Sequence, residues 1–362
     1  MPSETLNKHL RISQSDFGTL SSGETAQLYT LSNTKGMCVK ICNYGGIIVS
    51  LETEDKHGTS CDIVLGYDDI SAYETDPYYL GAIIGRYAGR IDQGLLSIDG
   101  KNYQLSLNNN DNQLNGGFKA LNKQLWQATI EHASDNVTLT LQHSSPDGDN
   151  GFPGNVDFKV KYSLNNSNEL LVEYFACTDK ATVVNLTQHS YFNLAGHNSG
   201  VVYQHQIQLN ADHFLPMNER IYPTGEQRSV ANTAHDFRQL TVLDENIASH
   251  DKQVILAKGF DNYWLANDDA INGAKFVAQA FEPNSGRLLS IYSDQPCIIL
   301  YTANYIDGSQ TGKNNFVYQK HGAFCFEPQR LANTTSSADI NNTILRPEKP
   351  FYSKSRYVFD HK

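Results

Sequence analysis

The chain has 362 residues, 40% of them hydrophobic and 10% aromatic, which is enough apolar material to bury a large core. Its 28 Lys and Arg residues stand against 39 Asp and Glu residues, so the net charge is −11. An acidic chain without a basic run is a poor partner for nucleic acid or for an anionic membrane surface. We therefore expect a globular protein that binds neither.

The sequence also lacks membrane and export signals. No stretch approaches the roughly 18 consecutive apolar residues of a membrane span, and residues 1–30 lack the apolar core of a secretory signal. The six cysteines are scattered along the chain and none forms a Cys-x-x-Cys pair. These features predict a cytoplasmic protein with reduced thiols.

Strand patterns dominate the chain after about 20 polar residues, which we expect to form an N-terminal extension. Apolar and polar residues alternate on either side of Asp99-Gly100, which predicts a β-hairpin near residues 95–108. The same alternation over 156–164 and 170–175 predicts a second hairpin. Helical periodicity is confined to short stretches at 70–78 and 240–248. We expect one all-β domain over residues 1–362, built from layered antiparallel sheets.

Common catalytic motifs are missing from the sequence. It has no GxGxxG after a strand, no GxxxxGK[ST], no GxSxG and no HExxH. Dinucleotide, phosphate-loop and zinc-protease functions therefore lose their usual support. What remains are polar residues set among apolar or glycine neighbours.

The segment 85–91, GRYAGRI, places two arginines directly after an apolar run. At least one guanidinium is expected to point inward, where it needs hydrogen-bond acceptors. Such an arginine could pair with a carboxylate and anchor a loop, or it could bind a ligand. The pattern is equally compatible with both roles. Both interpretations stay open from the residues alone.

Three further positions combine a titratable group with apolar or aromatic neighbours. His189 lies between an amide and hydroxyls in an otherwise apolar strand, and the rings of Tyr191-Phe192 that follow favour a pocket. Asp261 and Glu327 each lie against aromatic residues, where burial raises a carboxylate pKa. Each of these is also compatible with a structural role.

Taken together and in order, these segments resemble the galactose mutarotase (aldose 1-epimerase) family. The resemblance rests on the following segments: residues 43–47, residues 62–67, GRYAGRI at 85–91, NQLNGG at 112–117, SPDGDNGFPG at 145–154, TQHSYFNLAG at 187–196, GFDN at 259–262, YTANYIDG at 301–308 and CFEPQ at 325–329. TQHSYFNLAG and CFEPQ are highly specific for the family.

The resemblance implies a single β-supersandwich that interconverts the α and β anomers of free aldoses without metal or organic cofactor. It implies that Glu327 is the general base at the C1 hydroxyl and that His189 is the general acid at the ring oxygen. Arg90, Asp261 and Tyr191 match positions at the sugar. We expect His189 and Glu327 on opposite sides of one open pocket. Their ordinary pKa values, about 4.3 for Glu327 and about 6.5 for His189, predict activity in a mildly acidic to neutral window.

Two positions depart from the family pattern. Asn115 replaces a histidine that contacts the sugar, and Gly89 replaces a frequent asparagine before the arginine. An asparagine can exchange hydrogen bonds but carries neither charge nor a transferable proton. The replacement therefore predicts either a weaker catalyst or a pocket adapted to another sugar.

Several alternatives remain beside a mutarotase of galactose, glucose or a related monosaccharide. A hexose 6-phosphate epimerase would need extra basic residues in the pocket. A sugar-binding protein that has lost catalysis is indicated only by Asn115, whereas intact His189 and Glu327 oppose it. A glycosidase would use Asp261 and Glu327 as a carboxylate pair about 5 to 10 Å apart. The expected assembly is a monomer or a homodimer.

Overall fold

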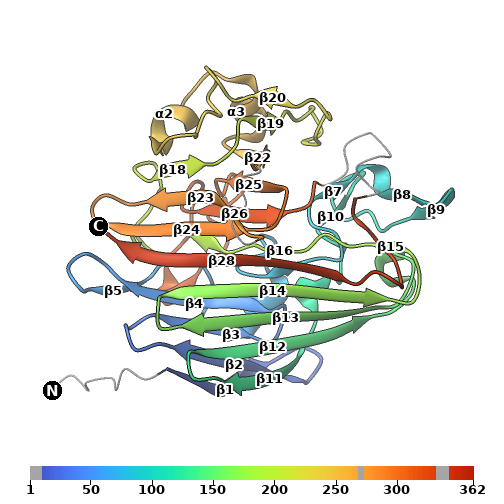
Figure 1. Cartoon of the computed structure of the whole chain (residues 1–362), viewed down its shortest axis with the longest axis horizontal. Coiled ribbons are helices and arrows are strands. Elements are labelled where there is room, and N and C mark those ends of the chain that lie inside the picture. The colour runs from blue at the N-terminus through green and yellow to red at the C-terminus, as the bar shows by residue number, and fades with distance from the viewer. Residues whose placement is uncertain (1–9, 268–272, 332–341) are drawn as a thin grey trace.

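The computed structural model describes residues 10–267, 273–331 and 342–362, and antiparallel strands dominate it (Figure 1). The largest sheet has nine strands, and the C-terminal strand lies between strands from the middle of the chain. In sheet order the strands are β11 (Gln127–His132), β12 (Asn136–Ser145), β13 (Val156–Asn165), β14 (Glu169–Thr178), β28 (Phe351–His361), β24 (Arg287–Ser293), β23 (Lys275–Phe281), β18 (Gln206–Leu209) and β21 (Thr241–Val242).

A five-stranded sheet comes from the N-terminal part of the chain. It contains β1 (Arg11–Thr19), β2 (Thr25–Ser32), β3 (Cys38–Cys42), β4 (Ile47–Glu54) and β5 (Ser60–Asp62). The expected polar extension over residues 1–20 is therefore wrong for its second half, because β1 pairs with β2 along its length. The strand is polar since it lies at a sheet edge and buries only Ile12. Residues 1–9 lie outside the described part.

A six-stranded sheet carries three of the residues singled out in the sequence, namely Tyr191, Asp261 and Glu327. Its strands are β17 (Tyr191–Phe192), β26 (Phe324–Gln329), β25 (Cys297–Tyr301), β22 (Asp261–Leu265), β19 (His213–Leu215) and β20 (Arg228–Ser229). Its two faces have different neighbours. Phe324 and Phe326 belong to a large apolar core shared with the nine-stranded sheet, and Phe192 contacts Tyr357 of β28 across this interface.

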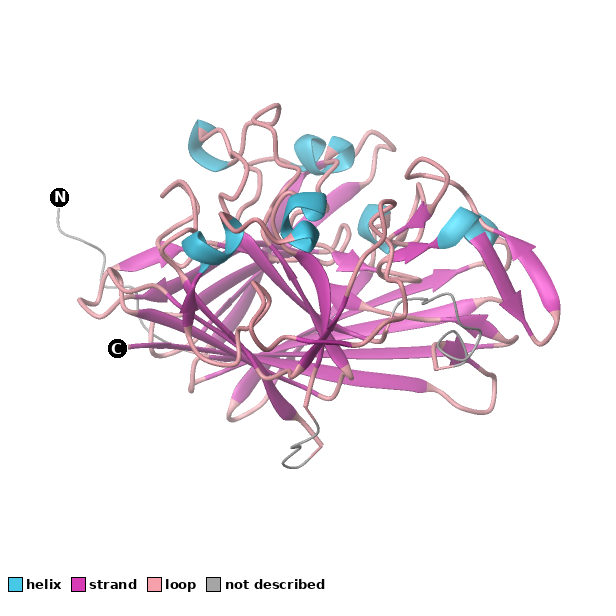
Figure 2. Ribbon diagram, turned by 90° about the horizontal axis from the view of Figure 1, so that it is seen from above, coloured by secondary structure: helices cyan, strands magenta, loops and turns pink. Residues whose placement is uncertain are grey.

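Shorter elements complete the fold, and the helices gather on one side of the strand layers (Figure 2). The two-stranded pairs are β10 (Gln113–Leu114) with β7 (Arg90–Ile91), β16 (Thr187–Gln188) with β6 (Ile83–Ile84), β15 (Thr182–Val183) with β27 (Ile344–Leu345), and β8 (Leu95–Ile98) with β9 (Lys101–Gln104). The helices are α1 (Ile70–Thr75), α2 (Leu243–Ile247) and α3 (Lys252–Ala257), with 3₁₀ turns η1 (Asp92–Gly94), η2 (Leu121–Lys123), η3 (Asp149–Gly151) and η4 (Lys313–Asn315).

These elements confirm the predicted all-β class with few short helices. Both predicted hairpins are present, as β8–β9 around Asp99-Gly100 and as β13–β14. Asp99 and Gly100 both have positive φ, as the tight turn requires. The expected helical stretches correspond to α1 and α2, whereas α3 was not predicted. Within the described ranges no helix is both long and apolar enough to cross a membrane. The single-domain organisation stays a prediction.

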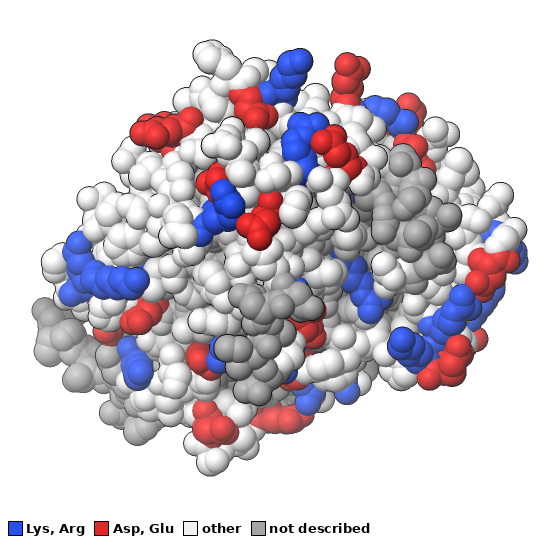
Figure 3. All heavy atoms as spheres, turned by 45° about the horizontal axis from the view of Figure 1, so that its top comes forward, with Lys and Arg blue, Asp and Glu red and all other residues white. Residues whose placement is uncertain are grey.

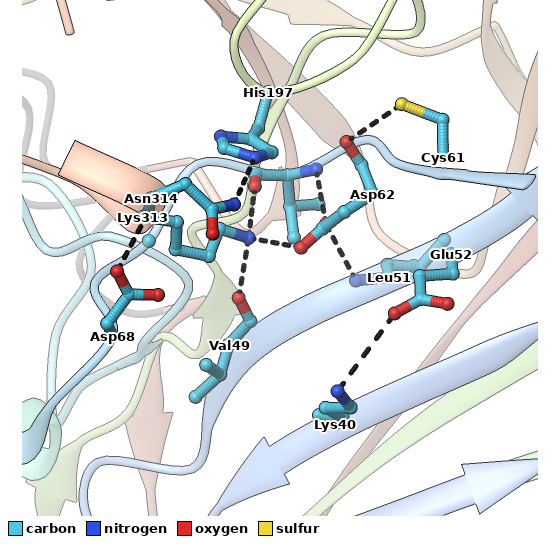
Figure 4. A network of polar contacts seen from close by, with 12 residues as sticks. Lys40, Val49, Leu51, Glu52, Cys61, Asp62, Asp68, His197, Lys313 and Asn314 are labelled. Atoms are coloured by element: carbon cyan, nitrogen blue, oxygen red, sulfur yellow. Dashed lines mark hydrogen bonds and ion pairs between the residues drawn. The ribbon is translucent and has the colours of Figure 1, made fainter. Parts of the chain in front are cut away.

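A buried lysine ties the connection between β25 and β26 to the N-terminal sheet (Figure 4). The ammonium group of Lys313 donates to the carboxylate of Asp62 at 2.5 Å and to the carbonyl oxygens of Val49 and Val64 at 2.9 and 2.7 Å. All three ammonium protons therefore have acceptors. These bonds hold η4, in the connection between β25 and β26, against β4 and β5.

We expect Lys313→Met to lower the free energy of unfolding by about 3–5 kcal/mol, because it leaves Asp62 as a largely buried carboxylate without its cation. Lys40→Met is the matched control, since the Lys40–Glu52 pair on β3 and β4 is 4.0 Å long and its side chains are each 39% exposed. That control should lose less than about 1 kcal/mol. Chemical denaturation of the three proteins measures both differences, and equal losses would contradict the anchoring role.

Candidate active site

Glu327 lies on β26, between β17 and β25 in the six-stranded sheet, on the face turned away from the large core. Successive residues of a strand point to opposite faces. Because Phe324 and Phe326 point into the core, Cys325 and Glu327 point to the other face of β26. The carboxylate of Glu327 is thereby held on a rigid central strand.

The pairing of β17 with β26 brings His189 to this carboxylate. Tyr191 pairs with Cys325, and continuing this antiparallel register by two residues places His189 opposite Glu327. The His189 Nε2 and Glu327 Oε1 atoms are 3.7 Å apart. The expectation that they lie on opposite sides of a pocket is therefore wrong, because the two side chains are direct neighbours.

The same face continues on the other side of β26. Cys325 pairs with Tyr301 of β25, and Tyr301 pairs with Asp261 of β22. A row of side chains from four adjacent strands thus runs from Tyr191 to Asp261. Residues that are 70 positions apart in the sequence therefore belong to one surface.

A pocket of about 540 Å³ opens over this surface. Its wall combines carboxylates and a guanidinium with several tyrosine rings, a combination typical of sites that bind polar ligands with apolar faces. The pocket is lined by all six residues that the sequence singled out, namely Arg90, Asn115, His189, Tyr191, Asp261 and Glu327.

Aromatic rings fix the imidazole of His189. Tyr191 stacks on it with ring centroids 5.0 Å apart, and Tyr79 stacks with centroids 6.2 Å apart. Tyr301 meets it edge-on. The backbone N–H of His189 donates to Ala82 O at 2.9 Å, which holds the main chain as well. The ring plane is therefore set by packing, with Nε2 facing Glu327.

Burial shifts the protonation of His189 and Glu327 in opposite directions. It lowers the pKa of His189 to about 4 and raises the pKa of Glu327 well above its ordinary 4.5. The nearby Asp261 also raises the pKa of Glu327, whereas Arg90 lowers it. Desolvation thus favours neutral imidazole beside carboxylic acid over the ion pair. Both forms hold one proton, which the two residues share.

Arg90 and Asp261 form a second polar pair in the pocket. The Arg90 Nη1 and Asp261 Oδ2 atoms are 3.8 Å apart, and their side chains are 17% and 15% exposed. Burial raises the pKa of Asp261 to about 6, and Arg90 opposes this rise. The guanidinium and carboxylate offer donors and acceptors that match sugar hydroxyls.

Asn115 is held at the pocket wall by Gly89, the residue before Arg90. Its side-chain oxygen accepts from the Gly89 N–H, and its N–H donates to Gly89 O, each at 2.9 Å. It has a φ of 52°, a left-handed conformation that asparagine tolerates. The amide nitrogen is then the group that can donate to a ligand.

The two arginines of segment 85–91 have separate roles. Arg86 is 2% exposed and donates to Ser145 Oγ and to the carbonyl oxygens of Ser145, Pro146, Pro153 and Gly154. It anchors the 145–154 loop through backbone carbonyls rather than through a carboxylate. Arg86 is thus a loop anchor without the expected carboxylate. Arg90 instead lines the pocket, where ligand binding stays a prediction.

Several pocket residues were missed in the sequence. Tyr79 has a φ of 62°, unusual for an aromatic residue, which no local pattern predicts. Tyr263 follows Asp261 by two residues on β22, so strand alternation would have placed it on the same face. Arg220 lies at the outer wall, where it pairs with Asp92 at 2.8 Å and donates to Asn112.

Donor atoms that suit a metal ion also meet at the floor of this site. His189, Cys325 and Glu327 are buried, and one nitrogen, sulfur or oxygen atom of each lies within 4.8 Å of the others. Chemically, the arrangement provides a paired acid and base at a buried surface, a polar wall and a potential set of metal ligands.

Known proteins resemble the chain over nearly its whole length. The family model for aldose 1-epimerase matches residues 27–358. Galactose mutarotase from Sus scrofa is 37% identical over 350 residues, which cover 96% of this chain and 98% of that protein. Aldose 1-epimerase from Escherichia coli is 32% identical and covers 93% of this chain and 96% of that protein.

Solved structures agree with the sequence comparisons. A galactose 1-epimerase from Lactobacillus acidophilus has a TM-score of 0.86 at 26% identity, and it covers 98% of this chain and 99% of its own. A GalM/aldose epimerase homologue from C. elegans has a TM-score of 0.83 at 29% identity, covering 92% of this chain and 98% of its own. With the family match, these similarities establish that the chain belongs to the aldose 1-epimerase family.

Proposed function

We propose that this protein is an isomerase that interconverts the α and β anomers of free aldohexoses such as galactose or glucose. The observation that carries the proposal is the contact between His189 and Glu327 on the floor of the pocket. The C1 hydroxyl and the ring oxygen of a pyranose are bonded to the same carbon. An acid and a base that serve these two oxygens must therefore be neighbours, as these residues are.

The reaction follows from the positions of the two groups. Glu327 takes the proton of the C1 hydroxyl while His189 gives its proton to the ring oxygen, and the bond between C1 and the ring oxygen breaks. Rotation about C1–C2 turns the aldehyde over. On reclosure the former ring oxygen, now a hydroxyl, returns its proton to His189 as it attacks C1, and Glu327 gives its proton to the C1 oxygen. The other anomer forms, and the residues are again carboxylate and imidazolium.

Burial acts on both sides of the ring-opening step. The reactive form of the pair is carboxylate with imidazolium, and ring opening converts it to carboxylic acid with neutral imidazole. Because desolvation favours the neutral form, it lowers the population of the reactive form and stabilises the open-ring state by the same preference. Arg90, Asp261, Tyr191 and Asn115 are proposed to hold the sugar so that its reacting oxygens face the pair.

The charges of the described lining residues favour a neutral sugar over a hexose 6-phosphate. The two arginines in the lining are both paired, Arg90 with Asp261 and Arg220 with Asp92. A phosphate group prefers cations that are available for bidentate contact. On the surface as well, basic and acidic side chains are interspersed on the face shown in Figure 3.

The proposed location follows from the cysteines. All six cysteines are free thiols. Cytoplasmic location is therefore part of the proposal.

Polarimetry on freshly dissolved α-galactose and α-glucose tests the activity directly. We expect His189→Asn and Glu327→Gln each to lower kcat by at least about 10²-fold, because each removes a proton-transfer group at similar volume. His213→Asn and Glu131→Gln, at exposed strand positions, are matched controls that keep wild-type rates. A folded wild type that leaves mutarotation at the spontaneous rate would reject the enzyme in favour of a sugar-binding protein.

The dependence of kcat/KM on pH tests the opposite pKa shifts of the two residues. Burial lowers the pKa of His189 to about 4 and raises that of Glu327 well above 4.5. The pair therefore keeps its proton at pH values where His189 alone would have lost it. We expect no fall in kcat/KM between about pH 4.5 and 5.5, measured against the spontaneous rate at each pH. A severalfold fall over this interval would show that activity follows the ionisation of His189 alone.

Substitution of Asn115 distinguishes a weaker catalyst from an adapted pocket. Histidine also tolerates a positive φ, and as an imidazolium it offers the pocket a charged donor while giving up the bond that Asn115 Oδ1 accepts from the Gly89 N–H. We expect Asn115→His to raise kcat/KM for at least one of galactose, glucose and xylose by several-fold, since a charge-assisted hydrogen bond replaces a neutral one. Lower activity on all three sugars would instead show that the pocket is adapted to asparagine.

A further inference from the structure

The thiol of Cys325 lies at the reacting groups but takes no part in the proposed reaction. Cys325 precedes Glu327 by two residues on β26, so both side chains are on the same face of the sheet. Its Sγ atom is 3.6 Å from Nδ1 of His189. The thiol is therefore buried against the imidazole, on the face of β26 that carries Glu327.

The three donor atoms are close to the spacing of metal ligands. One atom each from His189, Cys325 and Glu327 lies within 4.8 Å of the other two. Tetrahedral zinc with bonds of about 2.0 Å to nitrogen and about 2.3 Å to sulfur separates its ligands by about 3.5 Å. The spacing found here exceeds this separation by about 1.3 Å at most. Because the tyrosine rings hold the imidazole, the side chains of Cys325 and Glu327 are the ones that would move to close the site.

We propose that Cys325, His189 and Glu327 form an inhibitory site for a thiophilic divalent cation such as Zn²⁺. Thiolate, imidazole and carboxylate are the ligand types that zinc prefers, and three protein ligands leave a fourth position for water. On binding, the thiol and the carboxylic acid each release a proton to solvent. The cation, the thiolate and the carboxylate then sum to zero charge, and no electron is transferred.

The surroundings favour access by a cation. The open pocket gives an entry path to His189 and Glu327. Asp261 lies near enough to act electrostatically on both Glu327 and Cys325, and its negative charge attracts a cation. Arg90 opposes this attraction, but it faces Asp261 at 3.8 Å. The sulfur ligand selects zinc over magnesium and calcium, which prefer oxygen ligands alone.

Bound metal would stop the proposed reaction, because it occupies the acid and the base together. The kinetic part of this inference rests on the proposed function, whereas the spectroscopic part does not. Polarimetric rates with buffered free Zn²⁺ should fall at least tenfold and recover on addition of EDTA, and Mg²⁺ should have no effect. Each protein is compared with its own metal-free rate.

Cys325→Ser tests whether the thiol is a ligand. We expect it to raise the zinc concentration needed for half-inhibition by at least about tenfold. Cys177→Ser is the control, because Cys177 is an exposed thiol and its loss should leave the inhibition as in the wild type. Equal zinc sensitivity of the Cys325→Ser variant and the wild type would overturn the proposal, as would a wild type that zinc does not inhibit.

Co²⁺ gives a readout that is independent of activity. A thiolate bound to Co²⁺ produces a charge-transfer absorption that nitrogen and oxygen ligands do not. We expect this band in the wild type and in Cys177→Ser, and its loss in Cys325→Ser. Excess zinc should remove the band from the wild type. A wild type without the band would overturn the proposal even if Cys325→Ser failed to fold or the protein had no mutarotase activity.

Discussion

The antiparallel register between β17 and β26 is the constraint on which the site depends. Once Tyr191 pairs with Cys325, His189 must lie across from Glu327, and Cys325 must lie on the same face as both. The register is fixed because a shift by one residue would turn Glu327 toward the core and Phe324 and Phe326 toward the pocket. The hydrophobic packing of β26 against the nine-stranded sheet therefore determines the chemistry of its opposite face.

Burial of His189 and Glu327 changes the pKa values of both groups. In water a carboxylate and an imidazole keep their ordinary pKa values, but burial beneath the tyrosine rings lowers the pKa of His189 to about 4 and raises that of Glu327 well above its usual range. The proposed reaction moves a proton between the two residues through the sugar. The same closeness places a thiol next to both groups, so a surface arranged for proton transfer also offers metal ligands.

The sequence predicts local structure better than it predicts the site. Alternation and Asp99-Gly100 were sufficient for the hairpins, because a strand face and a tight turn are local properties. β1 was missed since an edge strand needs few apolar residues. The resemblance named the pocket residues, but the contact between His189 and Glu327 depends on pairing across 138 positions. Their opposite pKa shifts depend on burial, which only the folded chain determines.

A crystal structure of the protein with bound galactose would test the central claim most directly, because the claim concerns which sugar oxygens face the buried pair. The account predicts the C1 hydroxyl within hydrogen-bond distance of Glu327 and the ring oxygen within hydrogen-bond distance of His189 Nε2. Arg90 and Asp261 should then contact hydroxyls at the remaining carbons. A sugar bound in the pocket with C1 and the ring oxygen turned away from His189 and Glu327 would contradict the account.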